Sequence, residues 1–331
     1  MPYSDLHRAL AQTFLLQPTI TAKEAKKIIA SLEAAEAGPN HEGDLRPITD
    51  AIVSGYIADL NEELSKFDFE IRNMRDQKDR GTIYAFVNST PDTLIQSATH
   101  HSADEIAFFR RLLDAMFETN NTRRAEVFAV REQEALHLNK NPPRAEGEAT
   151  ATGGLTIKGA EEALAAFVEE GWLVKSRNNW YSLAPRGLLE LSVYLNQTYT
   201  DSDDEEDASD DDEEYHARKR IKKCHACSEL LTVGQRCEKL SCDVRMHEPC
   251  AVSFFRINKD KKCPRCKTTW TGKESVGEAA AGKLRRHVQK RAAVPTRQKR
   301  REETVEEGEE EQEEEEQQQQ RQQEAEEDDD E

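Results

Sequence analysis

All seven cysteines of this 331-residue chain fall between residues 224 and 266, with one histidine placed among them. The series reads Cys224-x2-Cys227-x9-Cys237-x4-Cys242-x4-His247-x2-Cys250-x12-Cys263-x2-Cys266. Cysteine and histidine are the usual ligands of structural Zn²⁺, and two cysteines two residues apart can hold one ion through a tight turn. Eight ligands complete two tetrahedral sites, so the series predicts two Zn²⁺ ions per chain.

The eight ligands admit two pairings, sequential or interleaved. In the interleaved cross-brace the first ion is held by Cys224, Cys227, His247 and Cys250, and the second by Cys237, Cys242, Cys263 and Cys266. We favour the interleaved pairing, because the Cys263-Pro-Arg-Cys266 turn needs a second short-looped pair opposite it. His247 occupies the one gap in the ligand series, whereas His225 and His216 are expected to point into solvent.

The surroundings of the cysteines favour metal binding over disulfide formation. The N-terminal stretch MPYSDLHRAL lacks the basic and apolar regions of a signal peptide, so we expect reduced thiols. Apolar runs of roughly 18 residues, which a membrane span requires, are absent, and we expect no membrane contact. A segment of this size with few large apolar side chains could hardly fold without its ions.

Charge separates the folded regions from the remainder. The net charge of −19 comes mainly from 11 acidic residues in 201–214 and 18 in 302–331. Between the cysteines and the second acidic segment, residues 283–301 hold nine Lys or Arg and no acid. Such blocks repel themselves and bury nothing, which predicts a disordered linker at 201–215 and a disordered tail at 276–331. The basic run suits DNA contact or nuclear import, and its plainer interpretation is a generic charged tail.

The N-terminal region has the pattern of a winged helix, which we place at residues 1–135. Apolar stripes predict helices around Leu10, around Ile29 behind a capping box of Thr21 and Glu24, and around Ile57. Alternating apolar residues on both sides of the polar stretch 75–81 then predict a hairpin. A further helix is expected around Phe109.

A second winged helix is expected at residues 150–200, and the cysteine-rich domain at 216–275. Thr156 can cap a helix that Gly171 ends, and two short strands are expected around Asn178 and Asn179. Trp172 and Trp180 are expected to be partly exposed at the wing. The fold class is therefore α+β, with tandem winged-helix domains followed by a cross-brace zinc domain.

These motifs resemble one known family. The ligand order, with GQRCEKLSCDVRMHEPC and CPRCKTTW, resembles the variant RING domain of the non-SMC element 1 family, a subunit of the Smc-five/six chromosome-maintenance complex. The stretches LHRALAQTFL, GTIYAFVNST and EEALAAFVEEGWLV are similar to the tandem winged helices of that family. The resemblance covers residues 3 to 270 and leaves the acidic linker and the tail unexplained.

The resemblance implies a RING-type E3 ubiquitin ligase subunit of a nuclear DNA-repair complex. Its expected partners are a ubiquitin-conjugating enzyme, a MAGE-like non-SMC element subunit and a kleisin subunit. A RING has no nucleophile of its own and catalyses by orientation. Three features depart from efficient RINGs: the small Ala226, Phe254 and Phe255 in place of a tryptophan, and Lys267 in place of a bridging arginine. We therefore expect weak, partner-dependent activity.

Two rival functions compete with this interpretation. Plant homeodomain fingers share the ligand order and read histone tails, but they usually carry an aromatic residue where this chain has Lys261. A structural or histone-reading chromatin protein without ligase activity is the alternative. A DNA-binding regulator is disfavoured, because the helices that would enter the groove, 157–170 and 49–66, each hold four acidic residues and one lysine.

Overall fold

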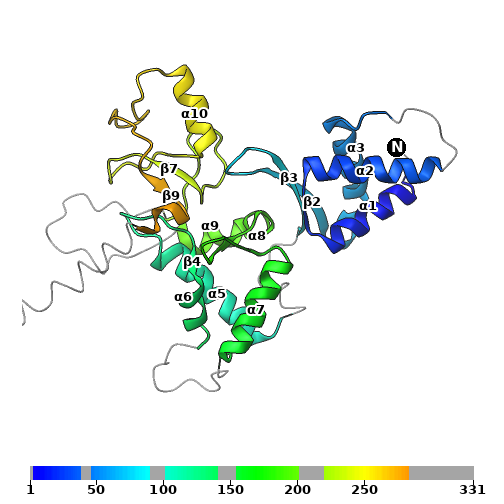
Figure 1. Cartoon of the computed structure of the whole chain (residues 1–331), viewed down its shortest axis with the longest axis horizontal. Coiled ribbons are helices and arrows are strands. Elements are labelled where there is room, and N and C mark those ends of the chain that lie inside the picture. The colour runs from blue at the N-terminus through cyan, green and yellow to red at the C-terminus, as the bar shows by residue number, and fades with distance from the viewer. Residues whose placement is uncertain (1–2, 39–45, 90–100, 141–153, 201–219, 283–331) are drawn as a thin grey trace, which may run out of the picture. The chain divides into compact units, whose positions relative to one another are not determined.

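The computed structural model describes residues 3–38, 46–89, 101–140, 154–200 and 220–282. Residues 1–281 form one compact unit, and the features below all lie within it. The expected linker at 201–215 and residues 283–331 of the expected tail fall outside the described residues. The fold is mixed α and β, with two winged helices followed by a RING-like domain (Figure 1). Among the described helices, none has the length and apolarity to cross a membrane.

The first winged helix consists of three helices and a three-stranded antiparallel sheet with the order β1-β3-β2. Its elements are α1 (Asp5–Leu16), β1 (Thr19–Thr21), α2 (Ala22–Ala37), α3 (Asp50–Leu64), the 3-10 turn η1 (Ser65–Phe67), β2 (Phe69–Arg75) and β3 (Thr82–Asn88). The expected capping box forms at α2, where the Glu24 amide donates to Thr21 Oγ1 and the Thr21 amide donates to the Glu24 carboxylate.

This first domain has an apolar core of its own. The helix stripes and the inner face of the hairpin meet around Phe14, Ile29, Leu60 and Ile71. The Asn61 side chain ties α3 to the edge strand, because its amide donates to the Ile71 carbonyl (3.0 Å) and its oxygen accepts from the Ile71 amide (2.7 Å). These two hydrogen bonds anchor the β2–β3 hairpin to α3.

The second winged helix begins earlier than the sequence pattern predicted. Its elements are α5 (Ala103–Asp114), the π-helical turn η3 (Ala115–Thr119), β4 (Val130–Arg131), α6 (Glu132–His137), α7 (Ile157–Glu169), β5 (Leu173–Lys175), β6 (Trp180–Leu183), α8 (Pro185–Glu190) and α9 (Ser192–Thr200). Strand β4 pairs with β6, and α5 packs in the second core, so residues 103–137 belong here. The predicted division at 135–150 differs because apolar spacing alone does not say which core a helix joins.

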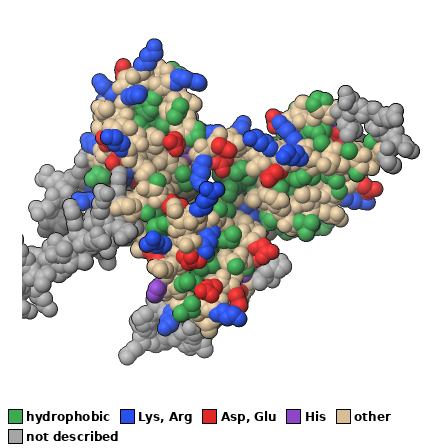
Figure 2. Space-filling model, in the orientation of Figure 1, with side chains coloured by type: hydrophobic (Ala, Val, Ile, Leu, Met, Phe, Trp, Pro, Cys, Tyr) green, Lys and Arg blue, Asp and Glu red, His purple; other side chains and the backbone are tan. Residues whose placement is uncertain are grey.

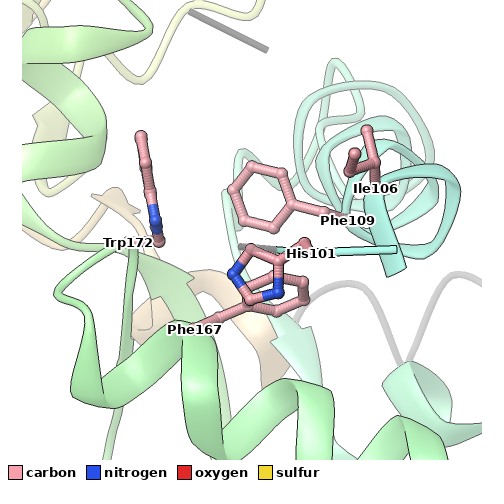
Figure 3. Close-up of a pocket in the computed structure, with 5 residues that line it drawn as sticks. All are labelled: His101, Ile106, Phe109, Phe167 and Trp172. Atoms are coloured by element: carbon pink, nitrogen blue, oxygen red, sulfur yellow. The ribbon is translucent and has the colours of Figure 1, made fainter. Parts of the chain in front are cut away.

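Trp172 is buried in this second core, not exposed at the wing as predicted. Only 3% of the residue is accessible, its indole nitrogen donates to the Glu170 carboxylate, and the Arg186 guanidinium stacks 4.5 Å above its ring. It lines a small pocket with His101, Phe109 and others (Figure 3). Trp180 is partly exposed. The spacing of the aromatic residues indicated a wing, but it did not indicate which face of the wing is buried.

The RING-like domain contains β7 (Gly234–Arg236), β8 (Arg245–Met246), α10 (Glu248–Ile257), β9 (Ser275–Val276) and the short η4 (Glu278–Ala280), with the strand order β8-β7-β9. The folded chain therefore extends past the predicted end at 275. Val276 is buried, and the Gly277 amide donates to the Glu126 backbone carbonyl. One apolar core runs through this domain and the second winged helix, joining Phe117 and Leu164 to Leu231 and Met246.

Candidate metal centre

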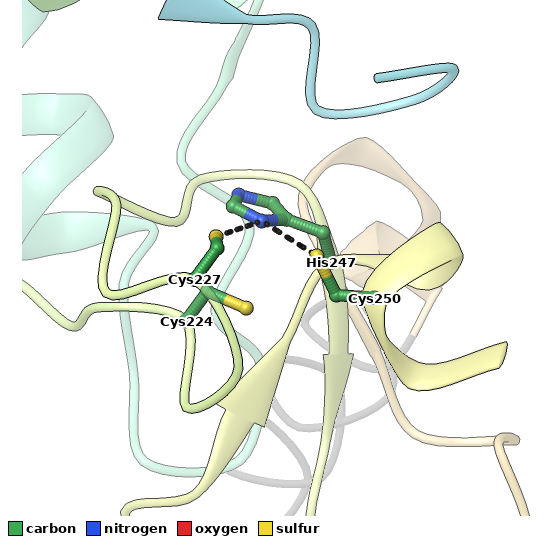
Figure 4. Close-up of side chains that lie close together, drawn as sticks. All are labelled: Cys224, Cys227, His247 and Cys250. Carbon is green, nitrogen blue, oxygen red and sulfur yellow. Dashed lines mark hydrogen bonds between the residues drawn. The ribbon is translucent and has the colours of Figure 1, made fainter. Parts of the chain in front are cut away.

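Four of the predicted ligands converge in a first cluster, Cys224, Cys227, His247 and Cys250, with all ligand atoms within 4.8 Å of one another (Figure 4). Nδ1 of His247 lies 3.3 Å from Sγ of Cys227 and 3.8 Å from Sγ of Cys250. Its Nε2 lies 3.3 Å from the Leu230 carbonyl oxygen. Because that oxygen can only accept, a protonated Nε2 would donate to it, which would leave Nδ1 as the atom that binds a metal ion.

The remaining four ligands form a second cluster, Cys237, Cys242, Cys263 and Cys266. Sγ of Cys237 lies 3.4 Å from that of Cys266, and Sγ of Cys242 lies 3.6 Å from that of Cys263. These separations exceed the roughly 2.05 Å of a disulfide. They approach the roughly 3.8 Å expected between two sulfurs each about 2.3 Å from one ion in a tetrahedron.

The same local turn presents the outer ligand pairs of the two clusters. The Ser228 amide donates to the Cys224 carbonyl (2.8 Å), and the Lys267 amide donates to the Cys263 carbonyl (3.0 Å). Ser228 and Lys267, each directly after the second cysteine of its pair, have φ values of 60° and 61°. A non-glycine residue is strained in this left-handed region, so each turn is held there by its surroundings. The turns aim both sulfurs of a pair inward.

The electrostatics of the clusters favour a dication. Burial, and then the neighbouring thiols, raise the pKa of Cys242 and Cys250 above the usual value. Burial also opposes ionisation of Cys224, but hydrogen bonds from His247 and the backbone outweigh it and lower the pKa of Cys224 to about 6. Thiolates this close repel one another, and a central cation removes that repulsion. Three thiolates with an imidazole, and four thiolates, are both donor sets that fit Zn²⁺.

The structure thus groups the predicted residues in the interleaved order and not in the sequential one. His225 is exposed and makes an edge contact with the Phe254 ring. His216 lies outside the described residues. Pro249, in the first turn of α10, favours a helix start between His247 and Cys250, which places both ligands at one helix end.

A buried ion network, which sequence reasoning missed, joins the RING-like domain to the second winged helix. The Glu126 carboxylate accepts from Nε and Nη2 of Arg245, each at 2.6 Å, and from Nζ of Lys222 at 2.9 Å. Nη1 of Arg236 lies 3.7 Å away. Burial opposes the charge on Glu126, but these cations outweigh it and lower its pKa to about 2. The network therefore stabilises the fold fully above pH 4.5 and loses this contribution as the pH falls toward 2.

The first winged helix contacts the RING-like domain through the turn between β2 and β3, a second feature that the sequence did not reveal. Oε1 of Gln77 accepts from the backbone amides of Thr232 and Val233, both at 2.9 Å. Nη1 of Arg80 lies 2.6 Å from Oε2 of Glu229. The sequence carries no signal for these contacts, because partners about 150 residues apart share no local pattern.

The ligand loops and α10 leave one face of the RING-like domain open. Ala226 and His225, between the first two ligands, are exposed, and Phe254 on α10 is partly exposed. Lys267 is exposed, and its ammonium donates to the Pro264 carbonyl at 3.1 Å. The described part of the winged helices does not cover these positions.

Positive charge gathers on the RING-like domain. Arg256, Lys259, Lys261 and Lys262 are all exposed, and Figure 2 shows Lys and Arg side chains over the region of α10. By contrast, a groove beside α7 has Leu136 and Val168 among its lining together with three glutamates, Glu132, Glu161 and Glu169, and with Lys175, which pairs with Glu132. An apolar, acidic groove suits a protein surface better than a phosphate backbone.

Tandem winged helices followed by cross-braced cysteine clusters define a winged-helix protein with a RING-like domain. The family described as the Nse1 non-SMC component of the SMC5-6 complex matches residues 7–191, and the RING-like domain family matches residues 224–266. The first match covers more than half of the sequence. The chain belongs to the Nse1 family of non-SMC components of the SMC5-6 complex.

Individual relatives agree with this assignment. The human protein named non-structural maintenance of chromosomes element 1 homolog is 24% identical over 267 residues, which cover 81% of this chain and 84% of the relative. Non-structural maintenance of chromosomes element 1 from Schizosaccharomyces pombe is 23% identical over 227 residues, covering 69% and 81%. A chain of a solved Nse1-Nse3-Nse4 complex shares the fold, with a TM-score of 0.61 at 20% identity over 82% of this chain and 98% of that chain.

Proposed function

We propose that this chain is a zinc-dependent RING-type E3 ubiquitin ligase subunit of a Smc-five/six-type complex, acting in DNA repair and chromosome maintenance in the nucleus. The observation that carries the proposal is the pair of interleaved clusters whose ligand-loop face keeps Ala226 exposed and Phe254 partly exposed. Two Zn²⁺ ions held by the eight ligands would fix the loops that form this face. The family membership supports the complex.

Orientation of a bound conjugating enzyme accounts for the proposed activity without a nucleophile in this chain. A RING holds the thioester-linked ubiquitin in a conformation open to attack, and the gain comes from reduced freedom of the reactants. Ala226 offers little apolar area for that contact. Lys267 is a compact charge that cannot make the two-pronged contact of an arginine. Weak intrinsic activity that rises with a partner follows from these two residues.

A MAGE-like subunit and a kleisin subunit are the proposed partners. A solved Nse1-Nse3-Nse4 complex contains a chain of the same fold, which supports assembly with such subunits. The acidic, partly apolar groove beside α7 is a suitable surface for a protein partner.

Any DNA affinity of the isolated chain would come from the basic run 283–301, so truncation after residue 282 should remove duplex binding in a fluorescence titration and leave partner binding unchanged. Duplex binding that survives the truncation would place the DNA contact in the folded unit.

Chain formation with a panel of conjugating enzymes, with and without the partner subunits, tests the activity. We expect Lys267→Arg to increase turnover several-fold, and Lys261→Arg, at another exposed lysine of the same domain, to leave it unchanged. Cys263→Ser should abolish activity together with zinc content. Absence of activity in every combination, with two Zn²⁺ ions bound, would contradict the ligase proposal and leave a structural role.

A further inference from the structure

Residues 228–233, which follow the first ligand pair, brace the first cluster from one side. The Glu229 backbone carbonyl accepts from the Cys224 amide at 2.8 Å, and the Leu230 carbonyl accepts from Nε2 of His247 at 3.3 Å. The Glu229 carboxylate also lies 3.4 Å from Sγ of Cys227. Three of the four ligands of this cluster are therefore oriented by one short loop, which we call the 228–233 loop.

The other side of the 228–233 loop is held by the first winged helix. Gln77, which is buried, places its one side-chain oxygen between the amides of Thr232 and Val233. Arg80 is positioned on the same turn and pairs with Glu229. The positive charge of Arg80 compensates the charge of Glu229. Without Arg80, the Glu229 carboxylate would place an uncompensated negative charge beside the thiolates of the first cluster.

The second cluster is braced differently, by contacts inside the RING-like domain and by Arg245, which donates to the Cys242 carbonyl at 2.7 Å and is held by Glu126 of the second winged helix. The Cys263 amide donates to the Thr268 carbonyl at 2.8 Å, and the Cys237 amide donates to the Val244 carbonyl at 3.1 Å. Sγ of Cys266 lies 3.3 Å from the Thr268 hydroxyl. The two clusters therefore differ in which part of the chain supports their ligands.

We propose that the β2–β3 turn of the first winged helix is a positioning element for the first metal site, acting through Gln77 and Arg80 on the 228–233 loop. Loss of these contacts leaves two amides without their acceptor and frees the Glu229 carboxylate toward the sulfurs, so the ion at this site leaves more easily. Outer partners of metal ligands typically change metal affinity about 10- to 100-fold. A partner that moves the first winged helix would thereby alter the ligand loop that carries Ala226. This inference rests on the metal binding within the proposed function.

Cadmium-113 NMR of the full chain distinguishes the two sites, because a metal bound by four thiolates resonates apart from one bound by three thiolates and an imidazole. A chelator is then titrated into the loaded protein, and the loss of each resonance is followed separately. In the double variant Gln77→Ala, Arg80→Ala we expect release from the three-cysteine site at least about 10-fold faster, with the four-cysteine site unchanged. Glu229→Gln should shift the resonance of the three-cysteine site selectively. Arg80→Lys keeps a positive charge beside Glu229, so this variant should retain most of the metal that an alanine at position 80 loses from the three-cysteine site.

Lys78→Ala provides the matched control, because Lys78 is an exposed residue of the same turn whose side chain makes no hydrogen bond or ion pair among the described residues. It should behave as the wild type. Equal acceleration at both sites, or none at either, in the double variant would overturn the proposal. A wild-type chain that binds no metal would instead overturn the metal centre itself, and the proposal with it.

Discussion

The two winged helices attach to the RING-like domain in different ways. The second shares a continuous apolar core with it and adds the buried network around Glu126. The first has a separate core and reaches the RING-like domain through a polar turn carrying Gln77 and Arg80. Similar folds can therefore serve as part of one cooperative unit or as a docked neighbour, depending on whether the contact is apolar and buried or polar and local.

Metal removal should give the largest effect and would test this comparison directly. Structural zinc contributes on the order of 10 kcal/mol per ion to the folding of small domains. With excess chelator we expect hydrogen exchange to accelerate in 220–281 and also in the second winged helix, while α1 to α3 stay protected. Chelator with an equal amount of zinc is the control. Accelerated exchange confined to 220–281 would show that the shared core is not cooperative.

Glu126→Ala should cost about 3–5 kcal/mol of unfolding free energy, because it removes the carboxylate that faces the buried guanidinium of Arg245. Denaturant unfolding of the zinc-loaded chain measures this value. Glu118→Ala is the matched control, since Glu118 pairs with Arg220 but is 46% exposed, and exposed pairs contribute up to about 1 kcal/mol. Equal losses for the two variants would mean that the network does not join the domains.

Glu190→Gln should give the smallest effect, at the point where α8 meets the first hairpin. Burial raises the pKa of Glu190, against the opposing charge of Arg186, so its ionised form destabilises the fold at neutral pH. The amide should raise stability at pH 7 by less than about 1 kcal/mol, since it gives up part of the bond to Arg186.

The pH dependence of this stability gain follows from the raised pKa of Glu190. A carboxyl whose pKa is raised on folding favours the folded state at low pH and loses this contribution as the pH rises through its folded value. The gain from Glu190→Gln should therefore shrink between pH 7 and pH 5. A gain that is constant over this range would exclude a titrating Glu190 as its source.

Local chemistry explains what the sequence could predict. Cysteine spacing indicated the interleaved clusters that the structure brings together, and apolar stripes with the Thr21 capping box indicated the helices and the first hairpin. Contacts between distant segments carried no such signal. Glu126 and Gln77 are single polar residues in loops, and β4 is two residues long, so neither periodicity nor propensity marks them. For the same reason the burial of Trp172 and the placement of residues 103–137 were not foreseen.

The partners of Glu126 also affect how the chain folds during its synthesis. Arg245 follows Glu126 by 119 residues, which a ribosome adds in roughly 6–24 s at about 5–20 residues per second. The core of the first winged helix draws on residues 6–86 and can close early in translation. The second must keep the Glu126 carboxylate accessible to water until Lys222 and Arg245 emerge. A nascent chain stalled before residue 222 should therefore hold one finished domain and one that still needs protection from aggregation.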